Sequence, residues 1–443
     1  MGIHAAGAMV QGTSPAPPAV SRTYAWLVFA LTFGLMLSDY MSRQVLNVVF
    51  PELKSEWLLT DAQLGSLSSI VALMVGVLSL PLSLLADRWG RIRCVVLAAA
   101  VWSLATLGCA VSASYGQMFL ARLIVGVGEA AYGSIGMAVV VSVFSVRLRA
   151  TLSGTFMAGA AFGSVLGVSV GGVVAQHLGW RWAFAVMGLF GMALAMVYGL
   201  VVTEKRLGSA SGGNEGRLAE HAPLRALLPR LFSSVSVVCV YVGSGLQMFI
   251  PMALLAWMPS FLNRYYSMPP ARAGLIAGVF ALITGISLIG GGIVADRVSR
   301  RVAAGKWNVA IACCFGSLVL LMTGFRLPTG PLQLALIGAG TLLVNATGGL
   351  AAALVSNLTP ASIAATAFAT LVLANNVLGL APGPAVTGML ADRMGLIGAL
   401  QVIPLVAVGA ATAFAVGKLF YERDLRRLEL IPDTPLSNPE PRP

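Results

Sequence analysis

Charged residues are scarce in this sequence, and that scarcity excludes an ordinary water-soluble domain. Only 10% of its 443 residues are Asp, Glu, Lys or Arg, against about 25% in soluble globular domains. There are only three histidines, His4, His177 and His221; they stand far apart and indicate no metal site. The five cysteines lie in apolar stretches without a CxxC spacing, which indicates inert buried thiols. No Walker sequence is present. We therefore expect no metal, no cofactor and no direct use of ATP.

Long apolar stretches take the place of charge. Hydrophobic residues make up 58% of the chain, and about 20 consecutive apolar residues form one membrane-crossing helix. Runs such as 94–113 and 182–202 are apolar all round, which favours helices over the alternating strands of a barrel. The expected helices are 24–48, 62–85, 93–112, 116–141, 149–175, 182–203, 233–259, 271–295, 307–326, 331–355, 362–390 and 397–420. The sequence thus predicts an all-α membrane protein with twelve transmembrane helices.

The composition between these runs divides the chain into five parts. Residues 1–23 are expected to be an N-terminal tail without a signal-peptide pattern, and 24–203 a six-helix bundle. Residues 204–230 contain the Gly/Ser-rich run 208–216 and are predicted to be a linker. A second six-helix bundle follows over 231–420, and 421–443 form the C-terminal tail.

The basic residues predict how the chain is oriented. The net charge is +12, but Lys and Arg are scattered through short loops rather than gathered on one face, which argues against nucleic-acid binding. With the N-terminus inside, 20 of the 28 lie in segments on the inner side and 6 in outer loops. This asymmetry is the positive-inside pattern. It predicts an inner (plasma) membrane protein with both termini and the linker in the cytoplasm.

Two short segments repeat between the halves. Residues 83–91 (SLLADRWGR) recur 209 positions later as 292–300 (GIVADRVSR), in each case after the second helix of the half. A weaker echo relates 172–179 to 388–395, at the end of the fifth helix of each half. Two parallel six-helix halves imply a pseudo-twofold axis along the membrane normal, with a solute site between them.

The first of these loops, DRWGR at Asp87–Arg91, resembles the signature of the major facilitator superfamily. The resemblance implies a gating role at the cytoplasmic side, where a carboxylate and guanidinium groups pair with neighbouring helix ends. The gating candidates are Asp87, Arg88 and Arg91, with Asp296, Arg297 and Arg300 in the second half. The alternative is that these residues only anchor the loop on the positive side.

The stretch RLIVGVGEA at Arg122–Ala130 is similar to that superfamily's RxxxGxGxA motif, and its Glu-Ala ending resembles the spinster-like bacterial branch. The spacing from Arg43 to Pro51 agrees. This resemblance implies proton-coupling roles for Glu129 and Arg43. That branch carries an Asp-Arg pair on its first helix, whereas here Ser42 precedes Arg43 and the carboxylate lies one turn back at Asp39.

Physical reasoning selects the same residues, because charges inside membrane helices are costly and usually mark a pathway or a paired site. Asp39 and Arg43 are four residues apart and share a helix face. Arg122 and Glu129 are seven apart, about 10 Å along a helix, and each needs a partner elsewhere. We predict a network between the first and fourth helices in which Glu129 or Asp39 binds a proton and releases its arginine to an anionic solute. A static network of buried salt bridges is the alternative.

Polar residues in the remaining helices are candidates for solute binding. In the second half they are amides, which also serve as interhelical hydrogen-bonding groups. Pro251 and the Pro382-Gly-Pro384 segment interrupt their helices, either for gating movements or as simple kinks. The substrate-binding candidates are Arg43, Tyr40, Tyr132, Gln247, Asn345, Asn375 and Asn376.

These observations predict a proton-coupled secondary transporter that works by alternating access on a small organic anion or an amphipathic solute. An uncoupled facilitator and a lysolipid or drug exporter are the alternatives. A membrane receptor or scaffold without transport is the alternative of another class. No nucleophile and base are arranged as an enzyme requires. The expected partners are the solute, protons and the lipid bilayer, with a monomer as the functional unit.

Overall fold

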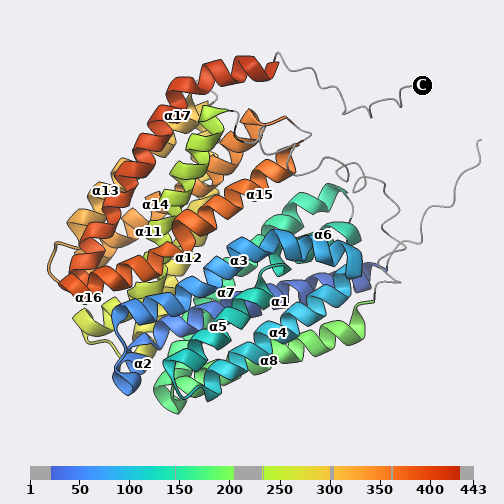
Figure 1. Ribbon diagram of the computed structural model, residues 1–443, viewed down its shortest axis with the longest axis vertical. Coiled ribbons are helices and arrows are strands. Elements are labelled where there is room, and N and C mark those ends of the chain that lie inside the picture. The colour runs from blue at the N-terminus through green and yellow to red at the C-terminus, as the bar shows by residue number, and fades with distance from the viewer. Residues whose placement is uncertain are drawn as a thin grey trace, which may run out of the picture.

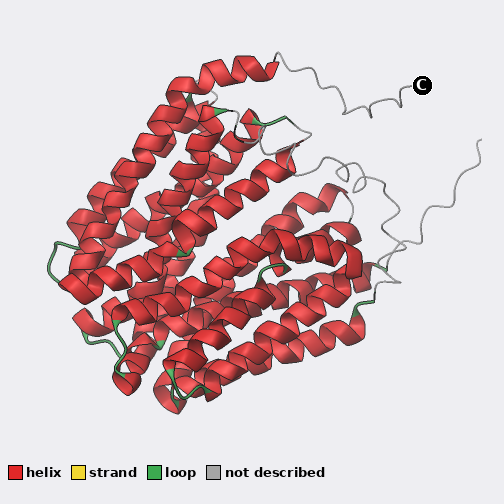
Figure 2. Cartoon of the chain, in the orientation of Figure 1, coloured by secondary structure: helices red, strands yellow, loops and turns green. Residues whose placement is uncertain are grey.

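The structure is a computed structural model that describes residues 21–144, 146–203, 232, 234–299, 304–360 and 363–429. Within these ranges the chain is helical, with short turns and no strand (Figure 2). Residues 1–20, the predicted linker 204–230, Arg300 and the tail beyond 429 lie outside the described residues.

Two successive sets of helices form the two halves of the molecule, coloured blue to green and yellow-green to red in Figure 1. The first half comprises α1 (Arg22–Val48), α2 (Phe50–Trp57), α3 (Asp61–Trp89), α4 (Arg91–Val111), α5 (Tyr115–Glu129), α6 (Tyr132–Val143), α7 (Val146–Leu178) and α8 (Trp180–Val201). The second comprises α11 (Val235–Tyr266), α12 (Pro270–Ser299), α13 (Gly305–Gly324), α14 (Pro331–Leu358), α15 (Ala364–Asn375), the π-helix η3 (Asn376–Leu380), α16 (Pro382–Val402), the 3₁₀-helix η4 (Ile403–Leu405) and α17 (Val406–Glu429).

Length and composition identify membrane-crossing helices among the described residues. Eleven helical segments are long and apolar enough to cross a bilayer. The last of them, Thr366–Arg426, has 61 residues and contains Gly395, whose φ of 77° interrupts the helix. Because about 20 residues suffice for one crossing, this segment supplies two. The described chain thus provides the twelve crossings expected, and the prediction of an all-α membrane protein is confirmed.

The structure departs from the expected helix boundaries in three places. The helix expected over 116–141 is divided into α5 and α6 at Ala130 and Ala131. In the helix expected over 362–390, the π-helix η3 precedes Pro382, which has no N–H to donate to the preceding turn. The eight-residue helix α2 was not predicted, because its sequence PELKSEW after Phe50 is short and polar.

The two halves contact one another through two equivalent helix pairs, α7 with α12 and α3 with α16. Each pair joins the fifth membrane helix of one half to the second of the other. A Cβ atom on Gly65 of α3 would lie 2.3 Å from the carbonyl oxygen of Pro384, and one on Gly274 of α12 would lie 2.3 Å from that of Val168. Gly65 and Gly274 are 209 positions apart, the same offset as the loop repeat. The sequence repeat is therefore a structural repeat with pseudo-twofold symmetry.

The halves are joined at the end of the molecule that carries α2, which we call the α2 end. There, Arg264 of α11 forms a two-pronged ion pair with Asp61 of α3, with nitrogen to oxygen distances of 2.6 and 2.8 Å. The amide of Ala271 donates to Gln176 in the same region. Toward the opposite end, where α6 ends and α15 begins, the ribbons of the two halves diverge (Figure 1). The structure therefore has its α2 end closed.

Candidate functional site

Two carboxyl groups share one guanidinium in the first half. The Nε atom of Arg43 lies 3.0 Å from Oδ1 of Asp39 and 2.7 Å from Oε2 of Glu129. The other oxygen of Glu129, Oε1, accepts a hydrogen bond of 2.9 Å from the hydroxyl of Ser42. The side chains of Asp39 and Glu129 are 3% and 0% exposed, whereas that of Arg43 is 17% exposed. The cluster of Asp39, Arg43 and Glu129, hereafter the carboxylate pair with its arginine, is reached from outside through the arginine.

Local helix geometry places these three residues together. Asp39 and Arg43 are one turn apart on α1, so their side chains lie on the same face. Glu129 is the last residue of α5, next to the break at Ala130. Helix α1 also packs against α7, where a Cβ atom on Gly163 would lie 2.7 Å from the carbonyl oxygen of Leu37. The glycines of α7 thus let α1 approach closely.

Arg122 acts within the same two helices but binds backbone rather than carboxylate. Arg122 is only 1% exposed. It donates to the carbonyl oxygens of Ser42 at 2.9 Å, Arg43 at 3.3 Å and Leu67 at 3.4 Å. The five N–H groups of a guanidinium suit several acceptors at once. Arg122 therefore ties α5 to α1 and α3 beside the carboxylate pair.

The two candidate tyrosines are placed differently. Tyr40 is partly buried, and the guanidinium of Arg43 lies 5.0 Å from the centre of its ring, within the range of a cation–π contact. Tyr132 is fully buried, and its hydroxyl donates to the carbonyl oxygen of Thr32 on α1. Of these two tyrosines, only Tyr40 contacts Arg43, the most exposed member of the carboxylate pair with its arginine.

The amide candidates of the second half lie in four helical elements, α11, α14, α15 and η3. Gln247 on α11 is fully buried and accepts a 3.5 Å hydrogen bond from the thiol of Cys314, while its Nε2 has no hydrogen-bond partner. Asn345 on α14 donates to the carbonyl oxygen of Thr341 one turn back, and Asn376 in η3 donates to that of Val372 on the preceding α15. The side-chain oxygen of Asn375 accepts from Ser244 at 2.8 Å. Among these four amides, Gln247 has an unused donor.

The gating candidates lie at the end opposite α2. The backbone of Asp87 and Asp296 is helical, but their side chains, like all of Arg300, lie outside what the structure describes. Arg88, Arg91 and Arg297 are exposed. Gly90, inside the DRWGR loop, has a φ of 101°. A glycine adopts this conformation without the strain that a side chain would add.

Sequence reasoning missed a second charged cluster, at the α2 end. Asp61 accepts from Lys54 at 2.6 Å as well as from Arg264 of the other half. Asp392 of α16 accepts from the backbone amides of Asp61 at 2.7 Å and Ala62 at 2.9 Å. Lys54 is seven residues from Asp61, but Arg264 and Asp392 are 203 and 331 residues away from it in the sequence, and no local spacing indicated these contacts.

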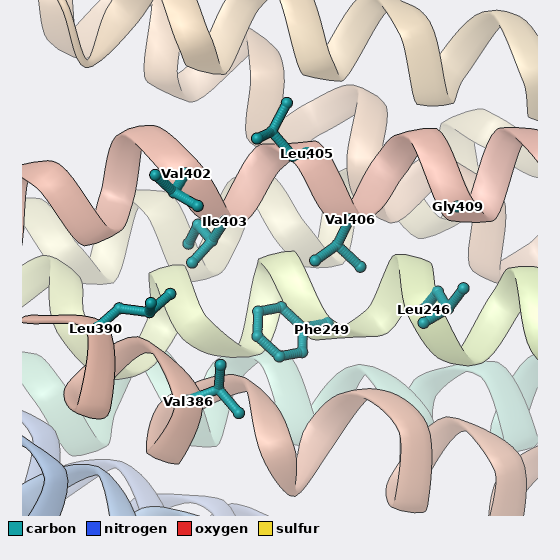
Figure 3. Close-up of a pocket in the computed structure, with 9 residues that line it drawn as sticks. All are labelled: Leu246, Phe249, Val386, Leu390, Val402, Ile403, Leu405, Val406 and Gly409. Atoms are coloured by element: carbon teal, nitrogen blue, oxygen red, sulfur yellow. The ribbon is translucent and has the colours of Figure 1, made fainter.

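An apolar cavity of about 400 Å³ lies on the second half between α11, α16 and α17 (Figure 3). Its lining includes Leu246, Phe249 and Val406, with Gly409 at one side, and no charged residue. It has no chemistry that would bind a proton or an anion, and the carboxylate pair belongs to the other half.

The comparisons with known proteins agree with this architecture. The family described as Major Facilitator Superfamily matches residues 31–384. The chain belongs to the Major Facilitator Superfamily. It is therefore a multi-pass membrane transporter of small molecules.

Its relatives within the superfamily are spinster proteins. The chain is 25% identical to protein spinster homolog 1 of Homo sapiens over 438 residues, covering 91% of this chain and 82% of the relative. It is 23% identical to protein spinster homolog 3 of Danio rerio over 465 residues, covering 97% and 92%. The expected resemblance to the spinster-like branch is confirmed.

A solved structure shares the fold. It is a bacterial homolog of the human lysosomal transporter Spinster, in an inward-facing and unoccupied conformation. The TM-score is 0.82 at 18% identity, over 91% of this chain and 99% of the other. The occupied conformation of that homolog gives a TM-score of 0.81.

Proposed function

We propose that this superfamily member is a proton-coupled secondary transporter that moves a small organic anion or an anionic amphipath by alternating access. The observation that supports it most is the carboxylate pair with its arginine, in which Asp39 and Glu129 lie within 3.0 Å of one nitrogen of Arg43. Asp39 and Glu129 share Arg43, while the neighbouring Arg122 donates to backbone carbonyls, so the two carboxylates have one ion-pair partner between them. Keeping both of them ionised in a buried position is costly, and binding of one proton relieves that cost.

The proton and the solute are coupled through Arg43. When Glu129 and Asp39 are both ionised, they hold the guanidinium by ion pairs. Protonation of Glu129 removes one of those ion pairs, and the partly exposed guanidinium becomes free to bind an anion. Tyr40 stacks beside the guanidinium and forms the adjoining wall of the solute site. Arg122 holds α1 and α5 in register while this exchange takes place.

The second half presents a neutral face to the solute. Its candidates are Gln247, Asn345, Asn375 and Asn376, with Tyr132 of the first half completing the proposed set. Gln247 has a buried donor without a partner, which suits hydrogen bonding to a solute oxygen. An anion bound by Arg43 on one side and by an amide on the other would contact both halves, as alternating access requires.

We assign the closed α2 end to the outside, because the positive-inside count places both termini and the linker in the cytoplasm. The structure then represents a state that is closed to the outside. Closure on the inner side is assigned to the two repeated loops, with Asp87, Arg88 and Arg91 in the first and Asp296, Arg297 and Arg300 in the second. The inner membrane is the proposed location and the monomer the proposed functional unit.

The proposal is tested by reconstituting the protein in liposomes that contain a pH-sensitive dye. Organic anions, cationic amphiphiles and lysolipids are added one class at a time, and solute-dependent proton flux is recorded. Glu129→Gln is expected to abolish that flux, whereas Glu422→Gln, which neutralises an exposed carboxylate on α17, leaves it unchanged. Solute uptake without proton flux in the unaltered protein would instead support an uncoupled facilitator.

A further inference from the structure

The helix α3 begins with backbone amides that the other half of the protein satisfies. The first N–H groups of a helix have no partner within it. Thr60 caps the amide of Gln63, and Gln63 reciprocates in a capping box. The two amides that remain, those of Asp61 and Ala62, donate to the two carboxylate oxygens of Asp392 on α16, at 2.7 and 2.9 Å. The N-terminal cap of α3 is therefore complete only while the outer end is closed.

The pseudo-twofold repeat places an equivalent cap at α12. The amide of Ala271 donates to Oε1 of Gln176 on α7 at 3.1 Å. Ala271 follows Ala62 by 209 positions, the offset that relates α3 to α12, and Asp392 follows Gln176 by 216, the offset of the echo between 172–179 and 388–395. Asp61 corresponds to Pro270, which has no N–H, so a single neutral amide oxygen suffices there. The two caps are thus related by the repeat, one charged and one neutral.

The helices under these caps approach closely in this closed state. A Cβ atom on Gly388 would lie 2.2 Å from the carbonyl oxygen of Asp61, and one on Gly172 would lie 2.5 Å from that of Pro270. Each capping residue lies one turn after such a glycine on its own helix. That glycine is in close contact with the backbone of the helix that is capped. Separation of the halves at this end would expose the capped amides to water and break both interactions together.

The residues around Asp392 also repeat the gate loop of the opposite membrane side. Residues 390–395 read LADRMG, and residues 85–90 read LADRWG. Both end in a glycine with positive φ, 77° at Gly395 and 101° at Gly90. The same short sequence therefore ends a helix at each face of the membrane. At the outer face its aspartate contacts the start of a helix in the other half.

We propose that Asp392 and Gln176 form a pair of cross-half helix caps that hold the outer gate shut, with Asp392 as the stronger, charged member. A carboxylate at a helix N-terminus interacts favourably with the helix dipole as well as with the amides. The ion pair of Asp61 with Arg264 lies at the same turn of α3 and adds to the closure. Loss of the Asp392 charge is expected to favour the outward-open state.

The test measures conformation directly. Nitroxide labels are attached at Ser55→Cys and Thr329→Cys, two exposed positions at the outer end of opposite halves, in a variant lacking the five native cysteines. Pulsed electron–electron distance measurements then give the populations of short and long separations. The value of a helix N-cap corresponds to roughly a two- to thirtyfold change in an equilibrium. Asp392→Ala, which removes both accepting oxygens, is expected to raise the ratio of long to short separations within that range.

Arg393→Gln is the matched control, because it changes the neighbouring exposed charge and leaves both caps in place. Gln176→Ala is expected to shift the populations in the same direction by less, since it removes one neutral hydrogen bond. The proposal is overturned if Asp392→Ala matches the unaltered protein, or if Arg393→Gln shifts the populations as far. Should Asp392→Ala not fold, an unshifted Gln176→Ala would overturn it. The proposal rests on alternating access, but this test needs neither solute nor proton flux, so each can fail alone.

Discussion

A substitution of Arg122 tests which buried charged residues take part in proton coupling and which hold the helices together. The sequence grouped it with the proton-coupling residues, but its three hydrogen bonds go to the backbone carbonyls of Ser42, Arg43 and Leu67. Arg122→Lys keeps the positive charge and replaces a planar fork by a single ammonium group. That group cannot span acceptors on both α1 and α3. We therefore expect the variant to lose at least one buried hydrogen bond that involves a charged group.

Each hydrogen bond of that kind contributes about 1.5–3 kcal/mol. With an unfolding entropy of about 2.1 cal/mol/K per residue, a loss of this size lowers the midpoint of thermal unfolding by roughly 2–3 °C. The assay is thermal unfolding of the purified protein in detergent, followed by proton flux in liposomes below the new midpoint. Arg122→Lys is expected to lower the midpoint and to keep coupled flux, whereas Arg43→Lys abolishes coupling.

The opposite pattern would refute this division. If Arg122→Lys unfolds at the unaltered temperature and loses proton coupling, then Arg122 takes part in proton transfer rather than in holding α1, α3 and α5 together.

Three further outcomes follow from other contacts. Gly163→Ala places a Cβ atom 2.7 Å from a backbone oxygen and is expected to destabilise the fold by about 1–3 kcal/mol in thermal unfolding, whereas Gly154→Ala, which meets nothing within 4 Å, has no such effect. Asp424→Ala removes the cap that this buried residue provides at the start of α11 and is expected to cost about 1–2 kcal/mol, with Glu422→Ala unchanged. Hydrogen bonds from Arg181 and Trp180, at the start of α8, lower the pKa of Glu56. The contribution of Glu56 to stability is therefore present at neutral pH and is lost as the pH falls through that lowered pKa. The difference in unfolding temperature between the unaltered protein and Glu56→Gln is expected to shrink over the same fall in pH.

Much of the fold could be predicted because membrane helices have a simple sequence signal. Apolar runs of sufficient length mark the crossings, and the 209-residue repeat marks the two halves. The break between α5 and α6 carried no such signal, because Ala130 and Ala131 are good helix formers and keep right-handed helical dihedral angles at the break. Helix α2 was missed since its eight residues mix polar and apolar side chains and are too few to show a helical apolar periodicity.

The site could be predicted in part. The spacing of Asp39 and Arg43 indicated a pair on one helix face, and the structure contains that ion pair. That Glu129 completes the pair could not be derived from spacing, because the contact depends on how α1 and α5 pack. The partners of Arg122 are backbone carbonyls, which every residue possesses and no sequence pattern distinguishes. The Asp392 cap was hidden for the same reason.

The central claim is that proton binding at the carboxylate pair drives solute movement. It is tested most directly by the equilibrium accumulation of solute in liposomes at a series of imposed pH gradients. One pH unit corresponds to about 1.36 kcal/mol per proton, so electroneutral symport of one proton with one monoanion predicts about a tenfold change in the accumulation ratio per pH unit. Glu129→Gln is predicted to give a ratio that does not respond to the gradient. An unaltered response in Glu129→Gln would contradict the account and assign the buried charges a purely structural role.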